Sequence, residues 1–527
     1  MKLILRKLPY KYVLFIPLIL CLLYFMPFVY RYHGYHDWLI GDHLTTPIAQ
    51  STSKCRGEGR ATVCEFTNLC VDSKHGAYIV NQEDISVMAN VMNSDEISDI
   101  FWKPAVRSSY PEKVQYINDT VFIYGLYAPY HFSHWMFNGL LPLYSMMRTY
   151  NATRNAWLMR VCTADYQPSL AIPQDISFLT DGKEIVFNYD DMLTEMQVMP
   201  PTVPICFANA VVGAGNLCSL IYCEKNIPAE HYEQFRNDIL NYFIHNGKWE
   251  NYMQKEQADK RVLSCINNTK IYTPDNGDIN IENNANTPVI GVLQRYRNRY
   301  ILNAEELINA LVNQKYTVKF FNFDIGCSLP ATAKLLEDVD ILITSHGNGI
   351  GDAIFMAPKT TVISIDSRFY SEAWFTYVHT ASGRRFYNFQ CESSDCQVAD
   401  IEMAKQVLER EGVVNLTYYE LLEFVGPKYP DRLITKYFAG NGEVYYRYAK
   451  NATRLVDVDK LVRFVKEILE EVPLVNNKSF VELCEIGKCC GPWCDVAMER
   501  NVFKKGNAWG GEERQTGTSV INWKAAA

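Results

Sequence analysis

Apolar residues along this chain gather in short runs that end at glycine, asparagine or proline, the pattern of buried strands joined by turns. The clearest run covers residues 339–345, and a glycine-rich turn with a short helical stretch separates it from a second run at 361–365. This order predicts a strand-helix-strand unit of a parallel sheet. Further apolar runs predict strands over residues 121–126, 206–212, 288–293 and 316–321, and helical spacing predicts helices over 232–243, 304–314, 331–338 and 458–469.

The turn after the first run has the sequence His346-Gly347-Asn348-Gly349. Glycine lets the backbone turn tightly, and the N–H groups at a helix N-terminus favour an anion such as a diphosphate. The simpler interpretation is a tight strand-to-helix turn without a ligand. His346 favours the binding interpretation, because ligands of open α/β sheets gather at the carboxyl ends of the strands.

Two arginines follow the predicted strand at 288–293. A guanidinium binds phosphate in a fork and keeps its charge, so Arg295 and Arg299 are predicted diphosphate ligands. Asn303 and Glu306 predict a capping box at the start of the next helix. Asp366 ends the strand at 361–365 and is either a ribose ligand or a turn acid.

A histidine stands where the strand at 121–126 leads into a helical stretch at 130–144. Ser133 is predicted to cap that helix. Taken by itself, His134 is a residue of the first helical turn that a backbone group satisfies.

Several of these segments resemble glycosyltransferase family 61. The resemblance rests on Ser345–Gly349 with Phe355–Pro358, on Gln294–Asn303, on Cys206–Gly213, on the Cys64–Cys70 segment and on the Leu-Leu-Pro-Leu run Leu140–Leu143. It implies an α/β, GT-B-like fold with two facing Rossmann-like lobes, and an inverting transfer from a UDP-sugar. It also implies that His134 faces the cleft as the catalytic residue.

The resemblance leaves the donor sugar open, because N-acetylglucosamine and xylose donors both occur in the family. We expect no metal and no cofactor besides the UDP-sugar. Some relatives carry carboxylates just before the Leu-Leu-Pro-Leu run, where this chain has Asn138 and Gly139. That departure puts a general base at these positions in doubt.

Composition bounds the classes of function. With 527 residues, of which 48% are hydrophobic and 21% charged, the chain can bury more than one core. The net charge of -8 provides no basic surface for nucleic acid, so we expect no nucleic-acid partner.

The N-terminus carries the signals of a membrane anchor. Residues 12–30 contain no charged side chain and are long enough to span a bilayer. Basic residues before this run predict a cytoplasmic N-terminus and a lumenal body. The alternative is a cleaved signal peptide, but the apolar run is long and no small-x-small cleavage site follows it.

A lumenal body agrees with two further patterns. N-glycosylation sequons begin at Asn118, Asn151, Asn267, Asn415, Asn451 and Asn477. Of the 16 cysteines, all but Cys21 follow the apolar run, and disulfides are favoured over zinc sites there. We therefore expect a single-pass type II protein of the Golgi membrane, with the endoplasmic reticulum as the alternative.

These patterns divide the chain as follows: a cytoplasmic tail 1–11, an anchor 12–30, a stem 31–54, an acceptor lobe 55–280, a nucleotide-sugar lobe 285–475, and a Cys-rich tail with a disordered end 476–527. The expected partners are a UDP-sugar and a glycoprotein or glycan acceptor. A nucleotide-cofactor oxidoreductase is disfavoured because no Gly-x-Gly-x-x-Gly opens a lobe. An inactive lumenal sugar-binding protein on the same fold remains the alternative function.

Overall fold

The chain is described from a computed structural model. It describes residues 49–72, 75–81, 87–92, 100–126, 131–162, 175–188, 203–215, 217–218, 225–256, 260–274, 287–296, 298–324, 326–345, 347–366, 375, 378–379, 382–390, 400–425, 447–448 and 450–475. The predicted tail 1–11, the anchor 12–30, most of the stem and the segment 476–527 lie outside these residues. Within the described ranges, no helix has the length and apolar character needed to cross a bilayer.

The first sheet is mixed, with eight strands in the order β6-β3-β2-β10-β7-β8-β9 and β1 paired to β2. Its strands are β1 Ser53–Arg56, β2 Val63–Asp72, β3 Gly76–Val80, β6 Ala105–Arg107, β7 Gln115–Gly125, β8 Ala156–Cys162, β9 Glu184–Asn188 and β10 Ile205–Val212. β10, β7, β8 and β9 run parallel, whereas β2 is antiparallel to β10. The strands predicted at 121–126 and 206–212 fall in β7 and β10.

Helices and a small hairpin cover the faces of this sheet. β4 (Ala89–Met92) pairs with β5 (Ile100–Trp102), and their apolar side chains share a core cluster with one face. The other face packs on a continuous helical run formed by α3 (Phe132–His134), η3 (Trp135–Leu140) and α4 (Leu141–Thr149). Disulfides Cys55–Cys64 and Cys70–Cys206 tie β1, β2 and β10 together, which confirms disulfide bonding at the N-terminal cysteines.

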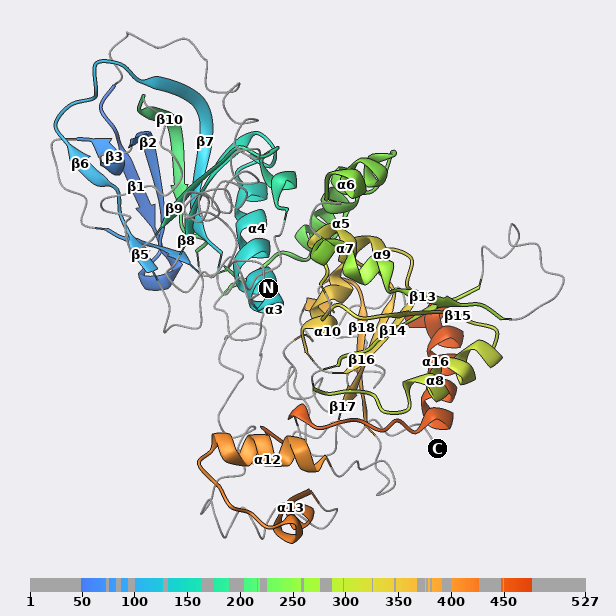
Figure 1. Cartoon of the computed structure of the whole chain (residues 1–527). Helices are drawn as coiled ribbons and strands as arrows, with labels where there is room; N and C mark the ends of the chain where they lie inside the picture. Colours follow the sequence, from blue (N-terminus) through green and yellow to red (C-terminus); the bar gives the residue numbers. More distant parts are fainter. Residues whose placement is uncertain are drawn as a thin grey trace, which may run out of the picture.

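The second sheet has the strand order β13-β15-β14-β16-β17-β18 (Figure 1). Its strands are β13 Lys270–Tyr272, β14 Val289–Leu293, β15 Thr317–Phe321, β16 Ile341–Ser345, β17 Thr361–Asp366 and β18 Arg385–Gln390. All neighbours are parallel except β13, which is antiparallel to β15. The parallel strands thus follow the doubly wound order 2-1-3-4-5, whose switch point lies between β14 and β16.

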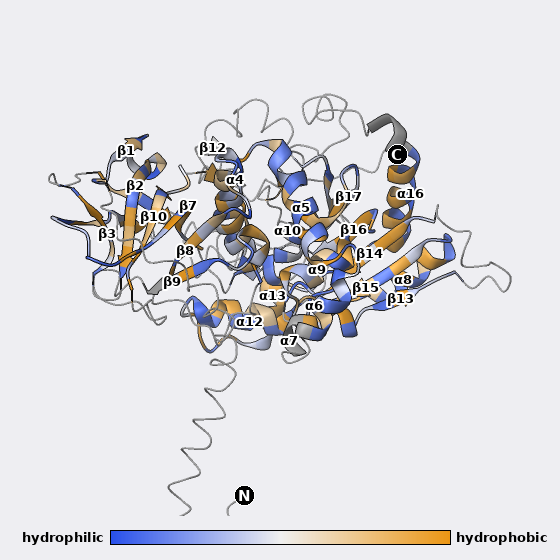
Figure 2. Ribbon diagram, turned by 90° about the horizontal axis from the view of Figure 1, so that it is seen from above, coloured by the Kyte–Doolittle hydropathy of each residue, from blue (hydrophilic) through white to orange (hydrophobic). Residues whose placement is uncertain are grey.

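Side chains alternate between the two faces of this sheet, as the pleat requires. Ile341 and Ile343 pack with helices α8 (Ala304–Asn313) and α16 (Val458–Val475). Leu342 belongs to the opposite core, with α9 (Leu329–Leu336), α10 (Asn348–Asp352) and η6 (Ala353–Phe355). Strands β14 and β16 therefore appear mostly apolar between helices whose outer faces are polar (Figure 2). The helices predicted at 304–314, 331–338 and 458–469 are confirmed within a few residues.

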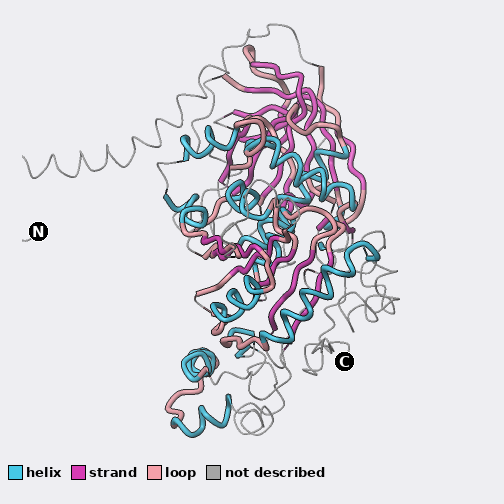
Figure 3. Tube along the Cα trace, turned by 90° about the vertical axis from the view of Figure 1, so that its right-hand side faces the viewer, coloured by secondary structure: helices cyan, strands magenta, loops and turns pink. Residues whose placement is uncertain are grey.

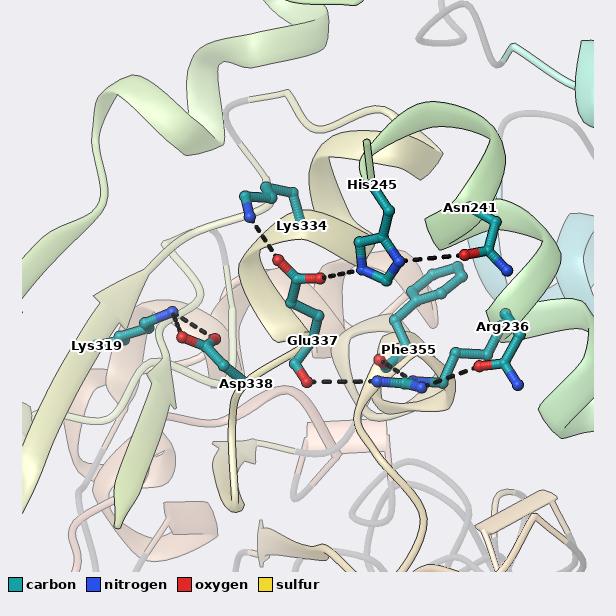
Figure 4. A network of polar contacts seen from close by, with 9 residues as sticks. Arg236, Asn241, His245, Lys319, Lys334, Glu337, Asp338 and Phe355 are labelled. Carbon is teal, nitrogen blue, oxygen red and sulfur yellow. Dashed lines mark hydrogen bonds and ion pairs between the residues drawn. The ribbon is translucent and has the colours of Figure 1, made fainter. Parts of the chain in front are cut away.

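Helices α5 (Ala229–Phe243), α6 (Lys248–Glu256) and α7 (Lys260–Asn267) belong to the core cluster that lies between the two sheets. On the side of the first sheet, Tyr144 Oη in α4 donates to Asp238 Oδ2 in α5 at 2.8 Å. The following contacts are on the side of the second sheet. Arg236 on α5 donates to the backbone oxygens of Phe355 (2.8 Å) and Glu337 (3.4 Å) (Figure 4). His245 pairs with the Glu337 carboxylate at 3.2 Å, and Cys265 is disulfide-bonded to Cys327. The sequence assigned residues 229–272 to the acceptor lobe. They contact both halves of the molecule, and that division stays a prediction.

A small helical unit lies at the lower end of the molecule (Figure 3). It consists of α12 (Ile401–Arg410) and α13 (Tyr418–Val425), whose apolar side chains form a core of their own with Tyr448 and Ala452. The remaining short elements are η2 Gly59–Ala61, η4 Ser177–Leu179, β11 Leu217–Cys218 and β12 Lys225–Asn226.

Candidate active site

The loop after β14 carries both predicted phosphate ligands. Gln294 is 1% exposed and closes this loop: its Nε2 donates to Ile301 O at 2.8 Å, and its Oε1 accepts from Ile301 N at 3.0 Å. The Gln294 side chain thereby bonds to the backbone of Ile301 and brings the two ends of the loop together. Arg295 and Arg299 lie between these anchor points, at the carboxyl end of β14 and next to the switch point of the sheet.

Gly347 lies directly against the two arginines. A Cβ added at this position would be 2.2 Å from Arg295 Nη1 and 2.8 Å from Arg299 Nη1. Its φ of +140° is also a conformation that residues with a side chain rarely adopt. Gly347 is therefore the residue whose lack of a side chain lets two guanidinium groups meet at the end of β16.

The other glycines of this turn allow close packing. A Cβ on Gly349 would come within 2.3 Å of Leu293 Cδ2 in β14, and one on Gly351 within 2.5 Å of Phe137 Cε2 in η3. Gly351 thus lets the helical run of the first sheet approach the turn of the second. Helix α10 has only five residues, so its dipole adds less to anion binding than the sequence argument assumed, and the arginines are the stronger feature.

A hydrogen bond joins the two parts of the site. Ser133 Oγ donates to Asn348 Oδ1 at 3.0 Å, and Ser133 is 5% exposed. The prediction that Ser133 caps its helix was wrong. The N-cap residue of α3 is His131, without a side-chain cap, because the Ser133 hydroxyl is used by a residue distant in sequence.

His134 contacts an amide in place of an acid. Its Nδ1 lies 3.2 Å from Asn138 Oδ1, one turn further along the helical run, and Asn138 is 1% exposed. An amide oxygen only accepts hydrogen bonds, so this contact favours the tautomer with the proton on Nδ1 and a basic Nε2. Residues Trp135–Leu140 form a π-helix, a local irregularity that is frequent at functional sites.

His131 adds a second imidazole. Its ring centroid is 4.6 Å from that of His134, and its buried Nδ1 has no hydrogen-bond partner within the described part of the chain. Burial lowers the pKa of His131 to about 4, and the nearby imidazole of His134 and the cations Lys450 and Arg299 act in the same direction. His131 is therefore neutral at physiological pH and lies within electrostatic reach of Arg299.

A carboxyl group lies near the Nε atom of Arg295. Asp324 Oδ2 is 3.9 Å from Arg295 Nε. Asp352, at the end of α10, is 4% exposed, and its burial together with the charge of Asp324 raises its pKa well above the usual value. The strongest positive potential is therefore expected on the side of Arg295 that faces Gly347 and Arg299.

The structure thus brings together Arg295, Arg299, Gly347 and Asn348, and it places His134 at the same junction through Ser133 and His131. Gly349 allows the turn to pack closely against Leu293 in β14. His346 lies outside the described residues. Asp366 ends β17 opposite Gln390, and its side chain is also outside them. Sequence reasoning missed His131, Ser133 as a partner of Asn348, and Lys450. The repeat of His131 and His134 three residues apart, on one face of a helix start, was the available signal.

The predicted sequons differ in their surroundings. Asn118, Asn151, Asn267 and Asn415 are exposed, whereas Asn451 is half-buried and Asn477 lies outside the described residues. Exposure is compatible with glycosylation of the first group, which stays a prediction.

Comparison with known proteins gives one positive result. Residues 132–363 match a family model whose description is Glycosyltransferase 61. This segment begins at α3 and ends in β17, so it contains His134, both arginines and the glycine turn. No curated protein matches the chain.

Proposed function

We propose that this chain is a member of glycosyltransferase family 61, whose model matches residues 132–363, and that it is an inverting enzyme that uses a UDP-sugar. The sugar, N-acetylglucosamine or xylose, would pass to a hydroxyl group on a glycoprotein or glycan in the secretory pathway. Family membership supports glycosyl transfer in general. The donor class, the stereochemistry and the acceptor are parts of our proposal.

The observation that carries the proposal is the meeting of Arg295 and Arg299 at Gly347. Two guanidinium groups at the switch point of a doubly wound sheet suit a diphosphate, because each offers a fork of N–H donors to phosphate oxygens. They would also stabilise the charge that develops on the leaving UDP. We therefore assign the donor to the second sheet, with His346 and Asp366 as further donor ligands.

The acceptor then approaches from the first sheet in a GT-B-like arrangement. A base on this side removes the proton of the acceptor hydroxyl as its oxygen forms a bond to the anomeric carbon. The bond from that carbon to the diphosphate breaks, and its electron pair leaves with UDP, so the configuration inverts. His134 is the proposed base, because the Asn138 contact favours a free lone pair on Nε2.

Membrane attachment through residues 12–30, a lumenal body and a Golgi address complete the proposal, with the endoplasmic reticulum as the alternative. They rest on the apolar run, the basic residues before it and the exposed sequons. The disulfides Cys55–Cys64, Cys70–Cys206 and Cys265–Cys327 support an oxidising compartment.

A donor screen tests the proposal. The purified full chain, in detergent, is incubated with a panel of UDP-sugars, and release of UDP is measured with and without EDTA. We expect slow hydrolysis of one donor, with N-acetylglucosamine and xylose donors as the first candidates, and no loss of rate with EDTA. Failure of every UDP-sugar and of UDP itself to bind would overturn the assignment.

The alternative is a sugar-binding protein that has lost catalysis. Asn138 favours it, because an amide stands where some relatives carry an acid. The same screen separates the two functions: binding of one UDP-sugar without any turnover, even with added acceptors, indicates the binding protein. Turnover that His134→Ala abolishes while UDP binding persists indicates the enzyme.

A further inference from the structure

Arg299 has an unusual backbone conformation that needs outside support. Its φ is +58°, in the left-handed region, which is unfavourable for a residue with a side chain. Such a conformation persists only where the surroundings determine it. Part of the support comes from β16, since Ser345 Oγ donates to Arg299 O at 2.5 Å.

The rest comes from a segment outside the family match. We call residues 447, 448 and 450–456 the strap. The strap runs along the arginine loop and pairs with its backbone: Arg299 N donates to Asn451 O at 3.0 Å, Arg454 N to Tyr300 O at 2.7 Å, and Leu302 N to Arg454 O at 2.8 Å. The residues next to Arg299 are therefore held by a stretch about 150 positions later in the sequence.

Asn303 extends this pairing. Its Nδ2 donates to Val456 O at 2.8 Å, and its Oδ1 accepts from Val456 N at 3.0 Å. The predicted capping box of Asn303 and Glu306 was therefore wrong: Asn303 is the N-cap residue of α8 but makes no side-chain cap, because its amide is used by the strap. Hydrogen bonds thus hold the strap against the arginine loop from Arg299 to Asn303.

Asn451 stands at the centre of the contact. Its Oδ1 accepts from Asn298 Nδ2 at 3.2 Å and from Arg299 Nη2 at 3.4 Å, and its Nδ2 donates to Arg447 O at 3.0 Å. The side chain therefore holds both the guanidinium of Arg299 and the neighbouring loop residue. The adjacent Tyr448 and Ala452 are buried in the core of the α12–α13 unit, which anchors this part of the strap.

We propose that Asn451 is the positioning residue that aims Arg299 at the donor diphosphate, and that Asn451 carries no glycan although it begins an Asn-x-Thr sequon. The inference rests on the proposed function for the diphosphate. The position of the side chain explains the missing glycan: both atoms of the Asn451 amide have partners, and Thr453 Oγ1 donates to Asp400 Oδ2 at 2.7 Å. The exposed Asn118, Asn151, Asn267 and Asn415 lack this environment.

The test compares two ways of removing the same sequon in the full chain. Asn451→Ala removes the contact with Arg299, whereas Thr453→Ala keeps it. UDP affinity is measured by calorimetry, together with KM for the donor once turnover is established. Because a hydrogen bond to a charged group contributes about 1.5–3 kcal/mol, we expect Asn451→Ala to weaken UDP binding by about tenfold or more. Thr453→Ala should bind UDP as the wild type does.

A double-mutant cycle separates positioning from a general structural role. If Asn451 acts through Arg299, then Asn451→Ala has little further effect on UDP affinity in an Arg299→Ala background. An equal loss of affinity in both backgrounds would overturn the proposal. The proposal would also be overturned if Asn451→Ala bound UDP as tightly as the wild type. If the wild type bound no UDP, that result would contradict the proposed function instead.

The absence of a glycan on Asn451 can be tested without any ligand. Peptide mapping of wild-type protein from a secretory host should find Asn451 unmodified, with Asn415 as the exposed comparison. A glycan on Asn451 in folded protein would overturn this half of the proposal. Hydrogen exchange at the Arg299 amide, which Asn451 O protects in the wild type, shows whether the loop stays ordered in each variant.

Discussion

Ser133 donates a hydrogen bond to Asn348, 215 residues further along the chain, with 3.0 Å between the hydroxyl and amide oxygens. The bond connects the helical run over the first sheet to the glycine turn of the second. Phe137, which lies against Gly351, makes the apolar contact beside it. These two contacts hold the two halves of the proposed site against each other.

Ser133→Ala should therefore lower turnover more than it lowers stability. Loss of one hydrogen bond costs about 1 kcal/mol of folding free energy, but it also releases the turn that holds Gly347. The control is Ser145→Ala, which removes another buried hydroxyl with a partner, His231 at 2.8 Å, away from the turn. Thermal midpoints and donor turnover are compared, and an equal loss of turnover in both variants would contradict the special role of Ser133.

Arg295→Ala should abolish UDP binding without unfolding the protein, because Arg295 lies on a loop whose ends Gln294 holds. Arg295→Lys keeps the charge but loses the fork of donors, so we expect an affinity loss of about tenfold or more. Arg463→Ala, at an exposed position of α16, is the control. Calorimetry with UDP checks the order wild type, Lys, Ala, and unchanged affinity in Arg295→Ala would remove this residue from the site.

Gly347→Ala should displace the arginines. The new Cβ would meet Arg295 Nη1 at 2.2 Å, and the backbone strain at φ +140° adds roughly 1–3 kcal/mol. Gly412→Ala imposes strain at φ +81° where nothing lies within 4 Å of the added atom. Both variants should lose thermal stability, but only Gly347→Ala should lose UDP binding. Retained affinity in that variant would show that the guanidinium positions do not depend on this glycine.

His131 makes stability depend on pH. An unfolded histidine takes up a proton near pH 6.5, whereas burial and nearby positive charges lower the pKa of folded His131 to about 4. Between these values the unfolded state binds more protons, so stability is complete above pH 6.5 and falls as the pH drops toward 4, by roughly 3 kcal/mol in all.

The measurement compares thermal midpoints of wild type and His131→Gln from pH 7.5 to 4. His379 has a pKa lowered to about 3, mainly by burial, and produces a loss of the same sign. Only the difference between the two proteins therefore reports on His131. We expect His131→Gln to lose less stability on acidification, and parallel curves would refute the assignment.

Local patterns predicted much of the fold, and long-range contacts account for what they missed. The strands and helices around Ser345 and Leu293 were found because their apolar residues already show the periodicity of the element. The ends of β14 and β16 meet in any sheet of this order, so Arg295 and Gly347 could be paired from sequence. Ser133 and Asn303 look like helix caps in sequence but bind residues far along the chain. No local sequence pattern predicted the π-helix. The packing of α5 near α9 involves the Arg236 contacts, which join residues about 100 positions apart in sequence.

Asn138 offers the last test, because it stands where some relatives have an acid and because its Oδ1 contacts His134 Nδ1 at 3.2 Å. In Asn138→Leu, which removes the acceptor but keeps the branched shape, we expect kcat to fall with donor KM unchanged, since the orientation and tautomer of His134 are affected. Asn138→Asp keeps an acceptor and adds a negative charge, which raises the pKa of a neighbouring imidazole by about one unit or more. A base with a raised pKa stays protonated to higher pH, so the acid limb of the kcat profile should move upward by a similar amount. If the profiles of wild type and Asn138→Asp coincide, then His134 is not the group whose titration limits turnover, and His131, the neighbouring imidazole, becomes the residue to test.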